Sequence, residues 1–202
     1  MNVFIVYAHP SQKSYTYKIL KKVIAALEKE NYNIELSDLY AMNFCSDMNE
    51  EEYEREGFAE TEKLLSLDVI KEQKKIENAD CIIFLYPVWW SDCPAKLKGW
   101  FDRVFSVGYA YGYNEVGEGI KSMRYVKFGL ALCTAGHSND FLEEIGIAKS
   151  MNTVMINDRL GKRFENKEMI IFGGTLELEK NLPIHEKYID ELVCKIKKYC
   201  AE

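Results

Sequence analysis

Three short segments each follow an apolar run of strand length and carry side chains that could bind a ligand. In chain order they are His9-Pro10-Ser11-Gln12-Lys13-Ser14-Tyr15-Thr16, Pro87-Val88-Trp89-Trp90-Ser91 and Thr134-Ala135-Gly136-His137-Ser138. Open α/β sheets bind ligands beyond the carboxyl ends of their strands. If the preceding runs are parallel strands, the three segments meet at one edge of the sheet and form a single site.

The first segment is rich in hydroxyl groups and leads directly into a helical pattern. Free N–H groups and the helix dipole make a helix N-terminus a binding place for anions, most often phosphate. The glycines of a P-loop or a GxGxxG turn are absent, and Ser14 could instead serve only as the N-cap of the helix. The spacing favours neither function of Ser14, and both can hold. His9 could be a general base or, more simply, a hydrogen-bonding partner of the phosphate.

The second and third segments supply aromatic and very small residues. Tyr86, Trp89 and Trp90 could wall a slot for a flat ligand by offset stacking. The same rings could instead form a lid over the sheet or half of a subunit interface. Ala135 and Gly136 would let backbone amides approach a ring closely, although a simple strand-to-loop turn needs the same residue types.

Other catalytic chemistries are poorly supported. Ser138 lies beside His137 and Asp140, but no GxSxG elbow precedes it. The carboxylates of residues 50–56 lack apolar neighbours that would raise a pKa. Six cysteines and three histidines give no metal-ligand spacing and no CxxC, so we expect neither a metal site nor a disulfide framework.

Three further polar or reactive residues have simple structural interpretations. Cys93 follows the second segment, but the sequence places no evident base or cation beside it, so we expect an unreactive thiol. Asp102 and Arg103 are expected to be surface ion-pair partners on a helix rather than catalytic groups.

The hydrophobic periodicity predicts strands and helices that alternate along the chain. The pattern predicts strands at 2–7, 33–36, 81–86, 126–133 and 169–173. The continuous apolar run at 81–86 is typical of a parallel strand covered on both faces. Apolar stripes predict helices at 14–30, before residue 79, after Pro94 and around 188–196. The pattern predicts one α/β domain over residues 1–202, a doubly wound parallel sheet of five strands with helices on both faces. We expect residues 46–65 to form a solvated excursion of short helices, and 114–122 a mobile loop.

Composition and charge narrow the class of protein. The chain has 202 residues, 48 % of them hydrophobic, and a formal net charge of −6. This excess of acidic residues argues against nucleic acid or an anionic membrane as the main partner. No apolar run reaches the ~20 residues of a membrane span, and the opening strand-like run lacks a basic leader. We therefore expect a cytoplasmic enzyme that does not insert into membranes.

Longer motifs carry a family resemblance. They are SDLYAMNF at 37–44, EQKK at 72–75 continuing to Ala79-Asp80, LKGWFDRVF at 97–105 and AYGY at 110–113. With the three segments above, the sequence resembles the NAD(P)H:quinone oxidoreductase (DT-diaphorase-like) family of flavodoxin-like flavoproteins, and its bacterial branch in particular. The resemblance spans about residues 2–175 and lacks the C-terminal extension of the longer animal members.

The resemblance implies a role for each segment. His9, Ser14, Tyr15 and Thr16 would hold the flavin's phosphate and ribityl chain. The isoalloxazine would be lined by Pro87, Val88, Trp89 and Trp90, and its pyrimidine side by Thr134, Ala135 and Gly136. Substrates would contact Trp90 and Phe141, under a cap formed by Tyr111 and Tyr113 of the other subunit of a homodimer. Phe141 and Ile147 replace a Tyr and a His of the animal enzymes, and Thr16 replaces a common Asn.

The implied activity is two-electron reduction of quinones or other flat acceptors by NAD(P)H. A hydride would pass through flavin N5 in a ping-pong cycle, with FAD or FMN as the flavin and NADH or NADPH as the donor. Two alternatives stay open: a flavin-binding regulatory subunit of a membrane transporter, and a flavodoxin-type electron carrier.

Overall fold

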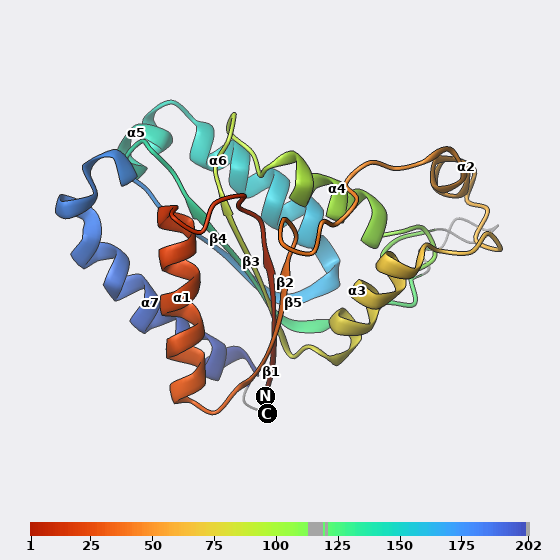
Figure 1. The fold of residues 1–202 in the computed structure, drawn as a ribbon, viewed down its shortest axis with the longest axis horizontal. Helices are drawn as coiled ribbons and strands as arrows, with labels where there is room; N and C mark the ends of the chain where they lie inside the picture. Colours follow the sequence, from red (N-terminus) through yellow and green to blue (C-terminus); the bar gives the residue numbers. More distant parts are fainter. Residues whose placement is uncertain (113–118, 120, 201–202) are drawn as a thin grey trace.

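The computed structural model describes residues 1–112, 119 and 121–200. Its centre is a parallel sheet of five strands in the order β2-β1-β3-β4-β5 (Figure 1). The strands are β1 (Asn2–Tyr7), β2 (Asn33–Asp38), β3 (Cys81–Pro87), β4 (Val126–Thr134) and β5 (Phe164–Phe172). The predicted flavodoxin-like α/β sheet is confirmed. Because β1 lies between β2 and β3, the strand order reverses beside β1, where a ligand crevice forms.

Helices cover both faces of the sheet, as predicted. α1 (Tyr15–Lys29) and α7 (Leu178–Cys200) pack on one face, and α3 (Leu67–Asn78), α4 (Ala95–Val104) and α6 (Ile147–Asn152) lie on the other (Figure 1). The residues of β3 are all buried and alternate between the two cores: Ile83 and Leu85 face α1 and α7, whereas Ile82 and Phe84 face α4. A continuous apolar strand is what two covered faces require.

The last third of the chain differs most from the prediction. β5 begins at Phe164, five residues before the predicted start at 169. The prediction missed this first part because Glu165-Asn166-Lys167-Glu168 is polar and leaves no apolar pattern. Polar residues are tolerated there because β5 is an edge strand of the sheet. The prediction also lacked α5 (Asn139–Glu144), α6 and the π-helical segment η1 (Thr153–Leu160), which has i→i+5 geometry.

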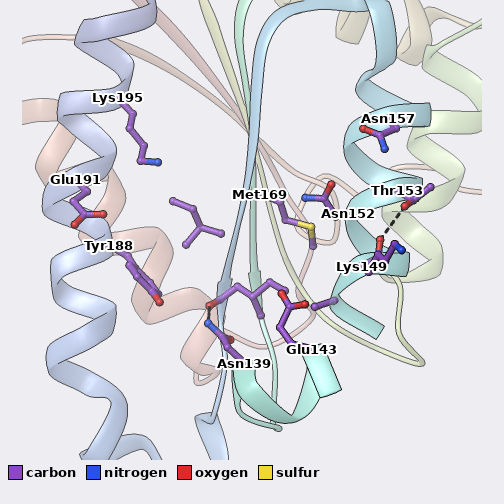
Figure 2. A pocket seen from close by; sticks show the side chains of 13 residues that line it. Asn139, Glu143, Lys149, Asn152, Thr153, Asn157, Met169, Tyr188, Glu191 and Lys195 are labelled. Atoms are coloured by element: carbon purple, nitrogen blue, oxygen red, sulfur yellow. Dashed lines mark hydrogen bonds between the residues drawn. The ribbon is translucent and has the colours of Figure 1, made fainter. Parts of the chain in front are cut away.

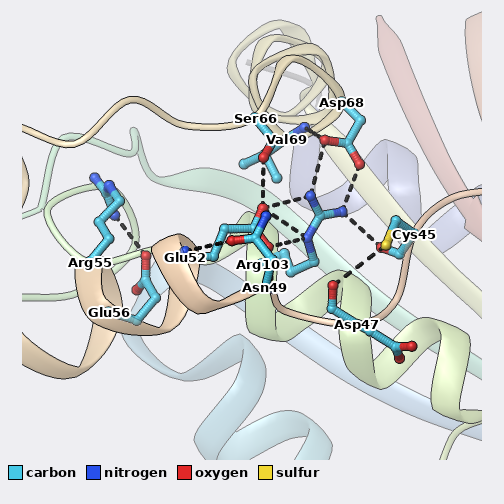
Figure 3. A network of polar contacts seen from close by, with 10 residues as sticks. All are labelled: Cys45, Asp47, Asn49, Glu52, Arg55, Glu56, Ser66, Asp68, Val69 and Arg103. Atoms are coloured by element: carbon cyan, nitrogen blue, oxygen red, sulfur yellow. Dashed lines mark hydrogen bonds and ion pairs between the residues drawn. The ribbon is translucent and has the colours of Figure 1, made fainter.

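The excursion at 46–65 contains α2 (Glu50–Phe58) and is less solvated than predicted. Glu52 and Arg55 are buried, and Arg103 of α4 is buried with them. Arg103 donates to Glu52 Oε1 at 2.6 Å, to Asp68 Oδ2 at 2.6 Å and to the Cys45 carbonyl oxygen at 2.8 Å (Figure 3). The expectation of a surface Arg103 was therefore wrong: this guanidinium ties the excursion to the sheet-covering helix.

A close backbone approach reinforces the same junction. A Cβ on Gly99 of α4 would lie 2.1 Å from the Ser46 carbonyl oxygen, so only glycine fits where the excursion crosses the helix. Residues 114–118 and 120 of the predicted 114–122 loop lie outside the described residues. None of the described helices has the length and apolar content that crossing a bilayer requires.

Candidate functional site

The loop after β1 delivers an N-capped helix to the predicted site. Ser14 Oγ accepts from the Tyr17 amide at 3.1 Å, which confirms the capping role. The Tyr15 and Thr16 amides lie in the first turn, where no carbonyl four residues earlier is available within the helix. His9 Nδ1 accepts from the Ser11 amide at 2.9 Å, and burial lowers the pKa of this imidazole. The first-turn amides of α1 are therefore available to an anion, beside a histidine whose lowered pKa favours the neutral form.

Direct hydrogen bonds join the three predicted segments. The hydroxyls of Thr16 and Thr134 are 2.8 Å apart and buried. The Val88 amide donates to the Thr134 carbonyl oxygen at 2.8 Å. The His9 ring meets the edge of Trp89 with centroids 5.9 Å apart. The predicted convergence of segments at the carboxyl ends of β1, β3 and β4 is therefore present in the fold.

The second segment ends in a tight turn that exposes an aromatic ring. The Trp89 amide donates to the Asp92 carbonyl oxygen at 2.9 Å, and the Asp92 amide returns a bond of 3.1 Å. Between them, Trp90 and Ser91 have φ of 48° and 62°, in the left-handed region. Trp90 is fully exposed in the single chain, and Trp89 is about half-exposed. Trp89 and Trp90 therefore place aromatic surface beside the predicted site, where a ligand or a partner chain could contact it.

A pocket of about 440 Å³ lies under this turn. It is lined by the predicted Val88, Trp90, Ala135, Gly136 and Phe141, with additional walls from Ser91, His137, Leu142, Ile145 and Ile147. The Phe141 and His137 rings pack with centroids 4.6 Å apart. An apolar concavity of a few hundred Å³ with few polar groups is typical of a small-molecule site. The replacement residues Phe141 and Ile147 thus both face the expected place of the flat ring.

Tyr111 lies apart from this pocket. It lines a second cleft of about 340 Å³, together with Glu56 and Phe105. Its hydroxyl donates to Glu56 Oε2 at 3.0 Å, and burial together with this carboxylate raises the pKa of Tyr111 to about 12. Tyr113, the other predicted cap, lies outside the described residues. Within one chain, therefore, Trp90 and Phe141 come together and Tyr111 does not.

No sequence pattern pointed to His185, which contacts Tyr15 of the first segment through a hydrogen bond. His185 is buried, and its Nε2 lies 2.9 Å from the Gly173 carbonyl oxygen. A carbonyl can only accept, so Nε2 carries the proton, and Nδ1 accepts from the Tyr15 hydroxyl at 2.8 Å. Because Tyr15 and His185 are 170 residues apart, no local pattern could reveal the contact.

His185 is expected to make folding stability depend on pH. Burial lowers its pKa below the ordinary 6.5, so the unfolded chain binds a proton more readily than the folded one. The stability that the neutral His185 contributes is fully present above pH 6.5. It is lost as the pH falls from 6.5 toward the lower pKa of His185 in the folded protein. In His185→Gln, which can keep both hydrogen bonds without titrating, the unfolding midpoint should fall less between pH 7.5 and about 5. Equal falls in both proteins would contradict this assignment.

A larger cavity lies elsewhere. Figure 2 shows it beside the free edge of β5, between α7 and the α5–η1 segment, with a volume of about 660 Å³. Its walls are mostly polar, among them Asn139, Lys149, Asn157, Glu191 and Lys195. None of the residues that line it belongs to the predicted site.

Within the described residues, no group of His, Cys, Asp and Glu could hold a metal ion. Cys93 is buried, and burial raises the pKa of its thiol to about 12, although Arg159 opposes the shift. Such a thiol is almost wholly protonated near neutral pH and is a poor nucleophile.

Known proteins match along most of the chain. The family described as "Flavodoxin-like fold" matches residues 1–189. The solved NAD(P)H:quinone oxidoreductase from Methanothermobacter marburgensis is 42 % identical, with a TM-score of 0.84 over 95 % of this chain and 98 % of that one.

Two curated relatives agree. "Uncharacterized NAD(P)H oxidoreductase" from Haemophilus influenzae is 33 % identical over 86 % of this chain and 84 % of its own length. NAD(P)H dehydrogenase (quinone) 1 from Rattus norvegicus is 36 % identical over 75 % of this chain, but the match spans only 59 % of that longer protein. With a family match over residues 1–189 and a five-stranded sheet in the order β2-β1-β3-β4-β5, this chain belongs to the flavodoxin-like fold family.

Proposed function

We propose that the protein is a flavin-dependent NAD(P)H dehydrogenase (quinone), reducing quinones or other flat acceptors by two electrons in a ping-pong cycle. The observation that carries the proposal is the direct linkage of an N-capped helix end to an aromatic-walled pocket through Thr16, Thr134 and Val88. One place suits a phosphate and the adjoining place suits a flat ring. The relatives named for NAD(P)H-dependent quinone reduction support the same activity.

The residues present fit a flavin. The Ser14 hydroxyl and the first-turn amides of Tyr15 and Thr16 would hold its phosphate, with His9 beside them. Val88, Trp89 and Trp90 would lie along the isoalloxazine with Pro87 at the strand end, and Thr134, Ala135 and Gly136 would approach the pyrimidine side. A bound flavin supplies the hydride chemistry, and the protein contributes stacking and alignment of the donor and acceptor in turn.

The pyrimidine edge has no side-chain proton donor at positions 141 and 147, which are Phe and Ile. In the described part of the chain, the amides of Gly136 and His137 donate to no protein acceptor, whereas the neighbouring Ala135 amide donates to Phe172. These two amides, with the imidazole of the exposed His137, are the groups that would stabilise negative charge on this edge. Backbone dipoles fixed in place can do this without a proton transfer.

The proposed enzyme is a homodimer. The exposed Trp90 and the separate placement of Tyr111 support a second subunit across the pocket. In this arrangement the pocket of one protomer is closed by Tyr111, and by Tyr113, of the other. Glu56 orients the Tyr111 phenol for this purpose by accepting its proton in a hydrogen bond.

The test starts with the absorbance spectrum of the purified protein and chromatography of any released flavin, which distinguishes FAD from FMN. Oxidation of NADH and of NADPH is then followed with a benzoquinone as acceptor. Rapid turnover without an accumulating semiquinone supports the enzyme. Flavin binding without reduction by either nucleotide would replace the proposal by the regulatory subunit, and a stable one-electron state would replace it by the electron carrier.

A further inference from the structure

An ion pair ties the turn that carries Trp90 to the π-helical segment η1. Arg159 Nη1 donates to Asp92 Oδ1 at 2.6 Å, and Arg159 Nη2 donates to Asp92 Oδ2 at 2.8 Å. Two parallel bonds between a guanidinium and a carboxylate fix the direction as well as the distance of the pair. The Arg159 side chain is only 9 % exposed, so water competes little for its donors.

Arg159 is itself held on several sides. Its guanidinium lies over the Phe101 ring at 5.5 Å from the centroid, and Nη1 approaches Cys93 Sγ at 3.5 Å. Its backbone carbonyl oxygen accepts from Arg163 Nε at 2.9 Å. Short π-helical stretches occur frequently at functional sites because they redirect side chains. Arg159 is therefore a fixed anchor.

The turn needs an anchor of this kind. Trp90 and Ser91 both have positive φ, a backbone conformation that favours glycine or asparagine at the centre of a two-residue turn. Two non-glycine residues there are strained, and such strain persists only where the surroundings hold it. Asp92 closes the turn: its backbone exchanges both bonds with Trp89, and its Oδ1 also accepts from the Cys93 amide at 2.6 Å.

The carboxylate keeps its charge at neutral pH. Burial alone would raise the pKa of Asp92, but the bonds from Arg159 and the Cys93 amide outweigh it, so the pKa lies below its ordinary value.

We propose that Arg159, acting through Asp92, is a positioning residue that sets Trp90 across the pocket and thereby determines how a flat acceptor stacks there. The effect on how an acceptor stacks rests on the proposed function, whereas the restraint of the 89–92 turn by Arg159 does not. Among the described residues, Arg159 bonds to Asp92 and Cys93 and lies over the Phe101 ring, and none of these three lines the pocket under Trp90. Its influence on the pocket passes through the 89–92 turn.

The restraint is tested on the full chain labelled with 5-fluorotryptophan, before any flavin is added. The three tryptophans give three fluorine resonances, assigned with Trp89→Phe and Trp90→Phe, and the buried Trp100 serves as an internal reference. Arg159→Lys keeps the charge but loses the planar fork. We expect it to shift or broaden the Trp89 and Trp90 resonances and to leave Trp100 unchanged. Unchanged Trp89 and Trp90 resonances would overturn the proposal.

A paired substitution and a matched control separate positioning from stability. In Arg159→Lys with Asp92→Glu, the longer acid restores the reach of the ion pair but not its planar fork, so the Trp89 and Trp90 resonances should move part of the way back to their wild-type positions. Arg103→Lys makes the same change in another buried arginine–carboxylate cluster and should lower the unfolding midpoint without moving the Trp89 or Trp90 resonances. Identical effects of the two single variants on these resonances would mean that Arg159 acts only through stability, and would overturn the proposal.

Turnover then tests the effect on the acceptor. In Arg159→Lys we expect KM for the quinone to rise roughly 3- to 10-fold, the equivalent of one aromatic stacking contact, with a smaller change in kcat. If the fluorine spectra change but KM for the quinone does not, the position of Trp90 does not determine how the acceptor binds, and that part of the proposal is overturned. Absence of quinone turnover in the wild type would remove the proposed function and leave the fluorine result to decide the restraint.

Discussion

Ser14→Asp is expected to weaken flavin binding about 30-fold while leaving the apo-protein as stable as the wild type or slightly more stable. A second negative charge within about 8 Å of the phosphate costs on the order of 2 kcal/mol at an effective dielectric constant of about 20. Aspartate is also a good N-cap, and α1 has no acidic residue in its first turn, so the helix itself gains from the new charge. Affinity is measured from the quenching of flavin fluorescence on titration with apo-protein.

The control adds the same charge at another helix start. Asn49→Asp changes the N-cap of α2, which already belongs to a capping box with Glu52, and should leave flavin affinity unchanged. The effect of Ser14→Asp should also diminish as the salt concentration rises, since it is electrostatic. Wild-type affinity in Ser14→Asp would show that no anionic group lies at the start of α1.

Arg103→Met is expected to destabilise the fold by about 3–5 kcal/mol, the range seen when one partner of a buried ion pair is removed. Methionine replaces much of the apolar stem but leaves Glu52, whose side chain is 10 % exposed, without its guanidinium. Asp68 also loses its partner, although its 36 % exposure allows water to compensate in part. The free energy of unfolding is measured by urea denaturation near neutral pH.

The pH dependence identifies the cause of this loss. Burial raises the pKa of Glu52 and of Asp68, but Arg103 more than offsets it, and both pKa values lie below the ordinary 4.5 and 3.8. Their contribution to wild-type stability is present above those values and is lost as the pH falls through the lower folded ones. The difference between wild type and Arg103→Met should therefore shrink on acidification. A difference that is constant with pH would indicate lost packing rather than an uncompensated carboxylate.

Lys98→Met is the matched control on the same helix. The Lys98–Asp102 pair spans 2.5 Å but both side chains are more than 40 % exposed, and exposed pairs contribute about 0–1 kcal/mol. A loss as large as that of Arg103→Met would show that the burial of the Arg103 cluster is not what matters.

The sheet could be predicted from the sequence because burial on both faces leaves a direct pattern. The seven residues of β3 are all buried, and its apolar run is unbroken up to Pro87. β5 could be recognised only over its apolar second half, since an edge strand tolerates the polar residues that follow Phe164. The short helices at 139–152 and the π-helical segment have too few residues to produce a distinctive period.

The site divides in the same way. The segments that follow β1, β3 and β4 could be found because the topology of a parallel sheet brings their ends together. The roles of Arg103, Arg159 and His185 could not be found in this way. Their hydrogen-bonding partners lie 51, 67 and 170 residues away in the sequence, respectively. An arginine in an amphipathic helix has the same local sequence whether its head meets water or a buried carboxylate, so Arg103 was expected on the surface.

In the proposed function, the pocket under Trp90 holds a flavin that accepts electrons from a nicotinamide nucleotide and passes them to a quinone. The most direct measurement is an anaerobic stopped-flow experiment on the flavin-loaded protein, first with NADH or NADPH and then with a benzoquinone. We expect the flavin absorbance to bleach in one two-electron step, without a semiquinone spectrum, and to recover fully on addition of the quinone. Failure of both nucleotides to bleach a bound flavin would contradict the account.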